Sequence, residues 1–107
     1  MTTFDKREEG FEKQFAHDEE LRFKATARRD RMLGLWAAGL LGLADAEADA
    51  YAKALVMVAL DTPGADVIFK KIRADFDAKG VAQSDHQIRR HMDELMAQAV
   101  AQVKASG

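Results

Sequence analysis

Two patterns in the sequence contain residue types that bind metal ions. His91 and Glu94 stand three positions apart, and the segment from Asp75 to Asp77 resembles the opening of a calcium-binding loop. Di-metal sites in four-helix proteins use two Glu-x-x-His copies, whereas this chain has one pair in the reverse order. A calcium loop needs a bidentate glutamate near its end, where this chain has His86. The sequence therefore predicts no metal site.

Side chains for catalysis are equally sparse. The chain has no cysteine nucleophile and no glycine-rich phosphate loop. No serine, histidine and aspartate set can be assembled from its scattered histidines. We therefore expect a protein that is not an enzyme and requires no cofactor.

The residues best suited to binding a partner lie in the first 18 positions. Phe4, Phe11 and Phe15 are separated by seven and four residues, so in a helix they share a narrow arc. Charged residues cover the other faces, and Gly10 interrupts the segment. An aromatic stripe is a poor surface for a free helix. Two interpretations stay open: the segment becomes helical in a partner's groove, or its stripe packs on its own protein.

A second candidate site is a basic face. Lys24, Arg28 and Arg31 follow one another at spacings of four and three, which places them on one side of a helix. Guanidinium and ammonium groups arranged in this way suit the phosphates of a nucleotide. The alternative, which the spacing alone favours, is a solvated face paired with Glu20 and Asp30.

Two further side chains have a functional and a structural interpretation. Trp36 could stack on a nucleotide base, although packing in the core is the favoured interpretation. His17 lies between the N-terminal segment and the rest of the chain, where its titration could make inhibition depend on pH, although an ordinary surface histidine is the favoured interpretation.

Composition restricts the class of protein. The chain has 107 residues, no cysteine, and a net charge of −2 from 16 basic and 18 acidic side chains. This near balance argues against nucleic-acid binding, which needs a basic surface. No apolar run reaches the length of about 18 residues that a membrane span requires. The N-terminus lacks the apolar stretch of a secretory signal, so we expect a soluble cytoplasmic protein.

The composition shifts near residue 32: residues 1–31 carry eight basic and eight acidic side chains, and the chain becomes apolar and helix-favouring from Met32 onward. Strand signals are almost absent, and start and stop signals predict helices over about residues 18–41, 45–60, 63–79 and 84–105. Short connections favour antiparallel neighbours. The predicted fold is all-α: a compact four-helix bundle of residues 19–107, preceded by a flexible, mobile N-terminal arm of residues 1–18.

Particular residues are expected to begin three of these helices. Asp45 is the candidate N-cap of the second helix. Thr62 is expected to cap the third, with Pro63 in its first position, where proline is tolerated. Ser84 and Gln87 have the spacing of a capping box at the start of the fourth.

Glycines are expected to act in two ways. Gly42 and Gly80 are plausible terminators of the first and third helices. Gly34 and Gly39 fall inside the first helix, where each costs about 1 kcal/mol relative to alanine. Close packing against a neighbouring helix would explain both.

Apolar side chains at spacings of three and four predict the core, most clearly in the last helix. The predicted core positions are Leu21, Ala25, Met32, Leu35 or Trp36, and Leu40; Ala48, Tyr51, Leu55 and Val58; Ile68 or Phe69, Ile72 and Phe76; and Ile88, Met92, Leu95, Ala99 and Val103.

Several blocks resemble one known family. FAHDEELRFKATARRDRMLGLWAAGLLG (residues 15–42), AYAK (50–53), VIFKKIRADF (67–76) and MDEL (92–95) are similar to the zeta subunits of alpha-proteobacterial F-type ATP synthases. The resemblance covers almost the whole chain. Asp30 and Gly39 depart from the family pattern, which has an uncharged polar residue and a better helix former there.

The resemblance implies a fold, a function and partners. Family members are four-helix bundles whose mobile N-terminal segment inhibits ATP hydrolysis by the synthase, and they are described as binding ADP or ATP. The expected partners are the catalytic head and the central stalk, and the expected location is cytoplasmic, peripheral to the inner membrane through the synthase. The expected partner-binding residues are Phe4, Lys6, Arg7, Glu8, Phe11, Lys13 and Phe15.

The predicted function is thus inhibition of F-type ATP synthase by insertion of the N-terminal arm into the catalytic head. One alternative is an adenine-nucleotide sensor of the same complex, with Lys24, Arg28 and Arg31 as the nucleotide-binding residues. Another is an assembly factor, which predicts that the bundle works without its arm.

Overall fold

The computed structural model describes residues 19–106, which form four helices. These are α2 (Glu19–Leu40), α3 (Asp45–Asp61), α4 (Ala65–Lys79) and α5 (Asp85–Ser106). Within this range there is no strand, so the predicted all-α fold of four helices is confirmed. The predicted flexible arm, residues 1–18, lies outside the described residues.

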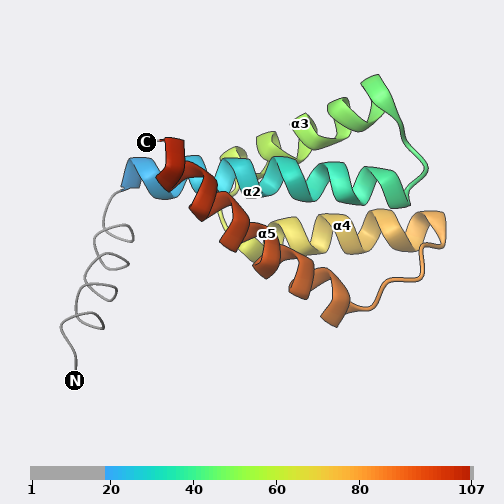
Figure 1. Ribbon diagram of the computed structural model, residues 1–107. Helices are drawn as coiled ribbons and strands as arrows, with labels where there is room; N and C mark the ends of the chain where they lie inside the picture. The colour runs from blue at the N-terminus through green and yellow to red at the C-terminus, as the bar shows by residue number, and fades with distance from the viewer. Residues whose placement is uncertain (1–18, 107) are drawn as a thin grey trace.

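The helices run up, down, up and down (Figure 1). α2 packs against α3 and α5, and α4 also packs against α3 and α5. We call the closed end the one that holds the connections 41–44 and 80–84. The open end is the one where α2 starts, residues 62–64 join α3 to α4, and α5 finishes.

One apolar core joins all four helices. Its largest fully buried side chains include Phe76, Leu33, Leu55 and Ile72. The predicted core positions of the last two helices are buried or partly buried, which confirms their spacing. Trp36 packs on this core, as the favoured interpretation predicted.

The predicted stripe of the first helix is partly wrong. Leu35 and Leu40 remain 39% and 40% exposed, whereas Leu33, Ala37 and Ala38 are fully buried. The buried face of α2 therefore combines Leu33 with the small residues Gly34, Ala37 and Ala38, and it does not include Leu35 or Leu40.

Gly34 explains why α2 and α3 come so close. A Cβ atom on Gly34 would lie 2.7 Å from the Cα atom of Ala52, closer than real atoms approach. The close packing predicted for Gly34 is therefore confirmed. It is wrong for Gly39, where an added Cβ atom would meet nothing within 4 Å.

The start of α5 is capped as predicted. The Gln87 backbone N–H donates to Ser84 Oγ at 3.1 Å, and the Ser84 backbone N–H donates to Gln87 Oε1 at 2.8 Å. Each side chain thus satisfies a backbone donor that a helix start leaves without a partner. Gly42 and Gly80 follow the ends of α2 and α4 with φ of 80° and 70°, the left-handed conformation that glycine adopts easily.

Two predicted caps are wrong. α3 begins at Asp45 itself, and its N-cap is Ala44, which makes no side-chain hydrogen bond. α4 begins at Ala65 after Gly64, so Pro63 lies outside that helix. Thr62 instead ends α3, because its backbone N–H donates to the Val58 carbonyl at 2.9 Å.

Polar contacts hold the closed end together. Arg73 donates to Asp77 Oδ1 at 2.7 Å, to Asp85 Oδ1 at 3.1 Å and to the Gln83 carbonyl at 2.6 Å. Tyr51 donates to Asp75 Oδ2 at 2.7 Å, which joins α3 to α4. Burial, followed by the hydrogen bond to Asp75, raises the pKa of Tyr51.

Candidate functional site

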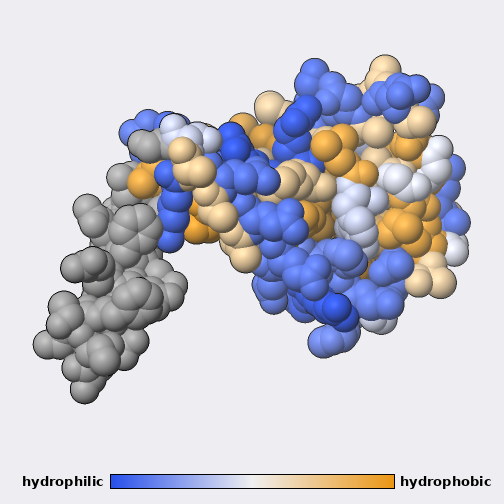
Figure 2. Space-filling view, in the orientation of Figure 1, coloured by the Kyte–Doolittle hydropathy of each residue, from blue (hydrophilic) through white to orange (hydrophobic). Residues whose placement is uncertain are grey.

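The open end contains a groove that we call the Arg29 groove. It has a volume of about 910 Å³ and lies between the first half of α2, the end of α3, the 62–64 connection and one side of α5. Its apolar lining includes Phe23, Leu60, Pro63 and Met96. Figure 2 shows hydrophobic side chains reaching the surface among hydrophilic ones on one face of the molecule.

Two of these apolar side chains are unusually exposed. Phe23 is 58% exposed and Leu60 is 48% exposed. Single exposed apolar residues are common, but two of this size in one concave surface form a site that a partner can cover.

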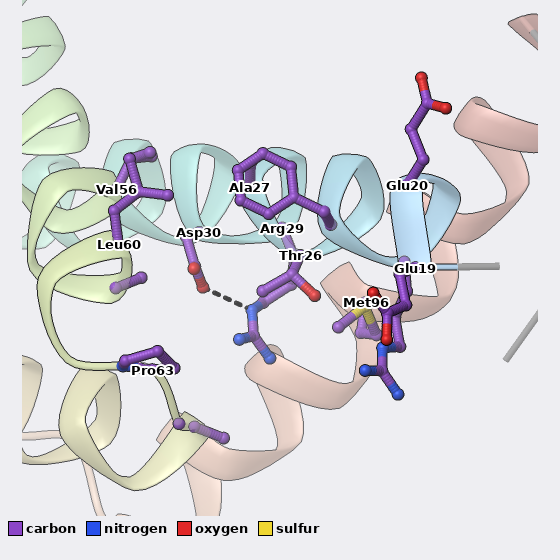
Figure 3. Close-up of a pocket in the computed structure, with 15 residues that line it drawn as sticks. Glu19, Glu20, Thr26, Ala27, Arg29, Asp30, Val56, Leu60, Pro63 and Met96 are labelled. Atoms are coloured by element: carbon purple, nitrogen blue, oxygen red, sulfur yellow. Dashed lines mark hydrogen bonds and ion pairs between the residues drawn. The ribbon is translucent and has the colours of Figure 1, made fainter. Parts of the chain in front are cut away.

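The floor of the groove is a buried ion pair. Arg29 Nε donates to Asp30 Oδ1 at 2.7 Å, and the two side chains are only 8% and 0% exposed. In Figure 3 the pair lies under α2, with Leu60 and Pro63 on one side and Met96 on the other. Adjacent residues of a helix do not face each other, so the two side chains must bend toward one another to make this contact.

The pair is incompletely satisfied. Among residues 19–106, Asp30 Oδ2 is buried without a hydrogen-bond partner. The same part of the chain offers no acceptor to the two terminal nitrogens of Arg29, which bonds through Nε alone. Burial raises the pKa of Asp30, and the charge and hydrogen bond of Arg29 offset this only in part. Arg29 is thus a buried cation with donors to spare beside an apolar groove.

The predicted basic face is brought together elsewhere. Lys24, Arg28 and Arg31 line a second groove, of about 760 Å³, between α2 and the last turns of α5. Lys24 pairs with Glu20 at 3.3 Å, as the solvated-face interpretation predicted.

The other pairings of the basic face differ from that interpretation. Arg31 pairs with Asp49 on α3 at 3.3 Å, and Arg28 donates to Gln102 on α5 at 3.3 Å. The expected pairing with Asp30 is wrong, because that carboxylate turns inward to Arg29.

The remaining candidates are placed as follows. Trp36 stacks on His91, with ring centroids 4.3 Å apart, and meets Phe76 edge-on at 5.7 Å. His91 Nδ1 lies 3.9 Å from Glu94 Oε2. No cluster of three metal-ligating side chains occurs in the range that the structure covers. The predicted arm residues Phe4, Lys6, Arg7, Glu8, Phe11, Lys13 and Phe15, and His17, lie outside the described residues.

Sequence reasoning missed the Arg29 groove. Arg29 belongs to none of the sequence patterns, and Phe23 lies off the predicted apolar stripe. The one available signal was Asp30, a carboxylate where the resembled family has an uncharged polar residue. A charge at such a position indicates an unusual local environment.

One of the comparisons with known proteins identifies a family. The family described as ATPase inhibitor subunit zeta matches residues 1–102. A structure solved by solution NMR is 34% identical with a TM-score of 0.69, covering 81% of this chain and 99% of that one. No curated protein matches the chain. None of the helices in residues 19–106 is long and apolar enough to cross a membrane. Since the family match spans nearly the whole sequence, the chain belongs to the ATPase inhibitor subunit zeta family.

Proposed function

We propose that this chain inhibits F-type ATP synthase by inserting residues 1–18 into the catalytic head, where they block ATP hydrolysis. The observation that carries the proposal is the family match, which begins at residue 1 and so includes the arm. The aromatic stripe of the arm supports insertion, because buried aromatic anchors supply much of the affinity of protein interfaces.

The proposed mechanism is selective binding of one state. The catalytic head cycles its interfaces between open and closed states as the central stalk turns. A helix that fits one state better than the others shifts the head toward that state and stops the cycle there. Phe4, Phe11 and Phe15 serve as anchors in the interface. The charged residues that orient the helix are Lys6, Arg7, Glu8 and Lys13.

The bundle has a supporting role in this proposal. α2 begins at Glu19, directly after the arm, and is held by α3 and α5. A rigid body at that point limits how far the arm enters the head. The chain then acts as a binding protein rather than a catalyst, and it reaches the cytoplasmic side of the membrane only through the synthase.

The test is ATP hydrolysis by the purified cognate head with three forms of the protein. Full-length protein is expected to inhibit, and a Phe4→Ala/Phe11→Ala/Phe15→Ala variant is expected to lose most of that inhibition. Leu40→Ala, which changes an exposed apolar residue of the bundle outside the Arg29 groove, is the control and should still inhibit. Circular dichroism checks that all three stay helical. Equal inhibition by the triple variant would show that the bundle, not the arm, carries the activity.

We also propose a second candidate function, in which ADP or ATP is a regulatory ligand. It is supported by the groove that Lys24, Arg28 and Arg31 share. Calorimetry with Mg-free ADP should detect binding that Arg28→Ala weakens and that Arg89→Ala, an exposed arginine elsewhere, leaves intact. If Arg28→Ala binds ADP as tightly as the parent does, this basic face is a solvated surface and not a nucleotide-binding site.

A further inference from the structure

The Arg29 groove has the properties of a surface that something covers. Phe23 and Leu60 leave about half of their side-chain area exposed in it. Covering apolar area of this kind is favourable by about 25 cal/mol for each Å² removed from water. The floor adds a directional element, because within residues 19–106 Arg29 is engaged only through Nε, by Asp30. An apolar helix face that contains one carboxylate would complement both features.

The chain's own arm carries such a face. Phe4, Glu8, Phe11 and Phe15 follow one another at spacings of four, three and four, so a helix presents all four on one side. Glu8 is the acid in the middle of this aromatic face. A carboxylate brought to a buried guanidinium forms a charge-assisted hydrogen bond, which is stronger than a neutral one.

Length and connection also fit. Phe4 and Phe15 are eleven positions apart, and so are Glu19 and Asp30, which line the groove along α2. Each interval is about 16 Å in a helix at a rise of about 1.5 Å per residue. The arm joins α2 at the mouth of the groove, where Glu19 itself is part of the lining. Residues 16–18 remain as a connection, and antiparallel helices are commonly joined by about two to eight residues.

We propose that in the free protein the Arg29 groove is the docking site of the chain's own residues 4–15. These residues lie antiparallel to α2, with Phe11 over Phe23 and Leu60 and with Glu8 toward Arg29. The groove covers the same face that enters the catalytic head, so docking and inhibition exclude each other. This consequence rests on the proposed function, whereas the docking itself does not.

Competition of this kind has a measurable effect. When only a fraction of molecules has the arm free, the apparent dissociation constant for the catalytic head rises by the inverse of that fraction. With about ten docked molecules for each free one, release of the arm lowers the half-inhibitory concentration about tenfold.

The first test is paramagnetic broadening in the full-length protein. Because the chain has no cysteine, Thr3→Cys carries a nitroxide at one site next to Phe4. Docking predicts broadened amide signals at Val56 and Ala59 and unchanged signals at Gly80, at the closed end. Broadening that is absent or spread evenly over the bundle overturns the proposal.

Matched variants identify the contacts. Leu60→Glu places a charge in the groove and should abolish the broadening, while Leu40→Glu, a similarly exposed leucine outside it, should not. Glu8→Lys should reduce the broadening, and Glu9→Lys, the same charge change on another face of the helix, should not. If either control behaves like its partner variant, the groove is not the site.

Two further measurements separate the alternatives. Nitroxide-labelled protein without ¹⁵N is mixed with unlabelled ¹⁵N protein; broadening in this mixture means that a second copy fills the groove, which overturns intramolecular docking. Leu60→Glu should inhibit ATP hydrolysis at a lower concentration than the parent does. If no form inhibits but the broadening at Val56 persists, the proposed function fails and the docking stands.

Discussion

α2 meets its neighbours differently in its two halves. Toward the closed end, Gly34 lies against Ala52 of α3 so closely that no side chain fits between the two backbones. Toward the open end, the same helix carries Arg29 and Asp30 on its inner side and Phe23 near the surface. Small residues let two helices touch, whereas long charged side chains hold them apart. The result is a dry core in one half and the Arg29 groove in the other.

The first prediction compares one large apolar side chain from each end. Phe76→Ala should lower the free energy of unfolding by about 3–5 kcal/mol, because it leaves a cavity in a fully buried site. Leu60→Ala, at an exposed position in the groove, should change it by about 0.5 kcal/mol or less. Urea unfolding followed by circular dichroism measures both. Similar losses would mean that the open end contributes to the core as much as the closed end does.

The second prediction uses two glycines of α2. Gly34→Ala should destabilise the protein by about 1–3 kcal/mol, because the added methyl group collides with the backbone of Ala52. Gly39→Ala has open space and should gain about 1 kcal/mol from helix propensity. The same substitution is thus expected to destabilise the protein at one position and to stabilise it five residues further along the same helix. Two stabilising results would show that α2 and α3 can separate at low cost.

The third prediction concerns the start of α5 at the closed end. Ser84→Ala removes the acceptor of the Gln87 backbone N–H and should cost about 1 kcal/mol. Ser106→Ala is the control, because that hydroxyl donates to the Gln102 carbonyl at the exposed end of the helix. Thermal unfolding of the two variants should differ clearly, and equal melting temperatures would contradict a role for the capping box.

The smallest effect is a pH dependence at the open end. The pKa of Asp30 is raised in the folded protein, so the folded state binds its proton more tightly than the unfolded state does. Stability from this group is therefore complete below its unfolded pKa of about 3.9 and is lost as the pH rises through the folded value. The free energy of unfolding of Asp30→Asn, minus that of the parent, should grow across this window.

Asp49 should produce a pH dependence of stability with the opposite sign. Hydrogen bonding to Lys53 and its charge lower the pKa of Asp49, so this group stabilises the protein above its unfolded pKa and less as the pH falls. The same difference for Asp49→Asn should therefore become more negative as pH rises. Denaturation at a series of pH values measures the free energy of unfolding of the parent and of both variants. If the Asp30→Asn difference follows the same pH trend as the Asp49→Asn difference, the raised pKa of Asp30 is contradicted.

The fold was largely predictable because apolar spacing decides it. Ile88, Met92 and Val103 recur at helical intervals, and no alternative element accommodates them. The end residues were predicted less well. Pro63 satisfies the rule for a first helical position, but Gly64 adopts a φ of 134° that starts α4 two residues later. A backbone conformation of that kind is chosen by the tertiary structure, not by the residue before it.

The Arg29 groove was not predictable, because it depends on which side of α2 faces inward. Spacing places Asp30 with the basic residues on a solvated face, whereas the structure buries it. Asp30 lies four positions before Gly34, so in a helix it shares the face that packs against α3.

The position of the one tryptophan decides what an optical experiment can detect in this protein. Trp36 is the sole indole of the chain, and its ring contacts join α2, α4 and α5 through Phe76 and His91. Its fluorescence therefore reports separation of these helices and is insensitive to fraying of the first turns of α2. Local opening has its own free energy, often well below that of global unfolding. If the fluorescence transition occurs at a higher denaturant concentration than the loss of helical circular dichroism, the protein unfolds first at the end of the bundle away from Trp36.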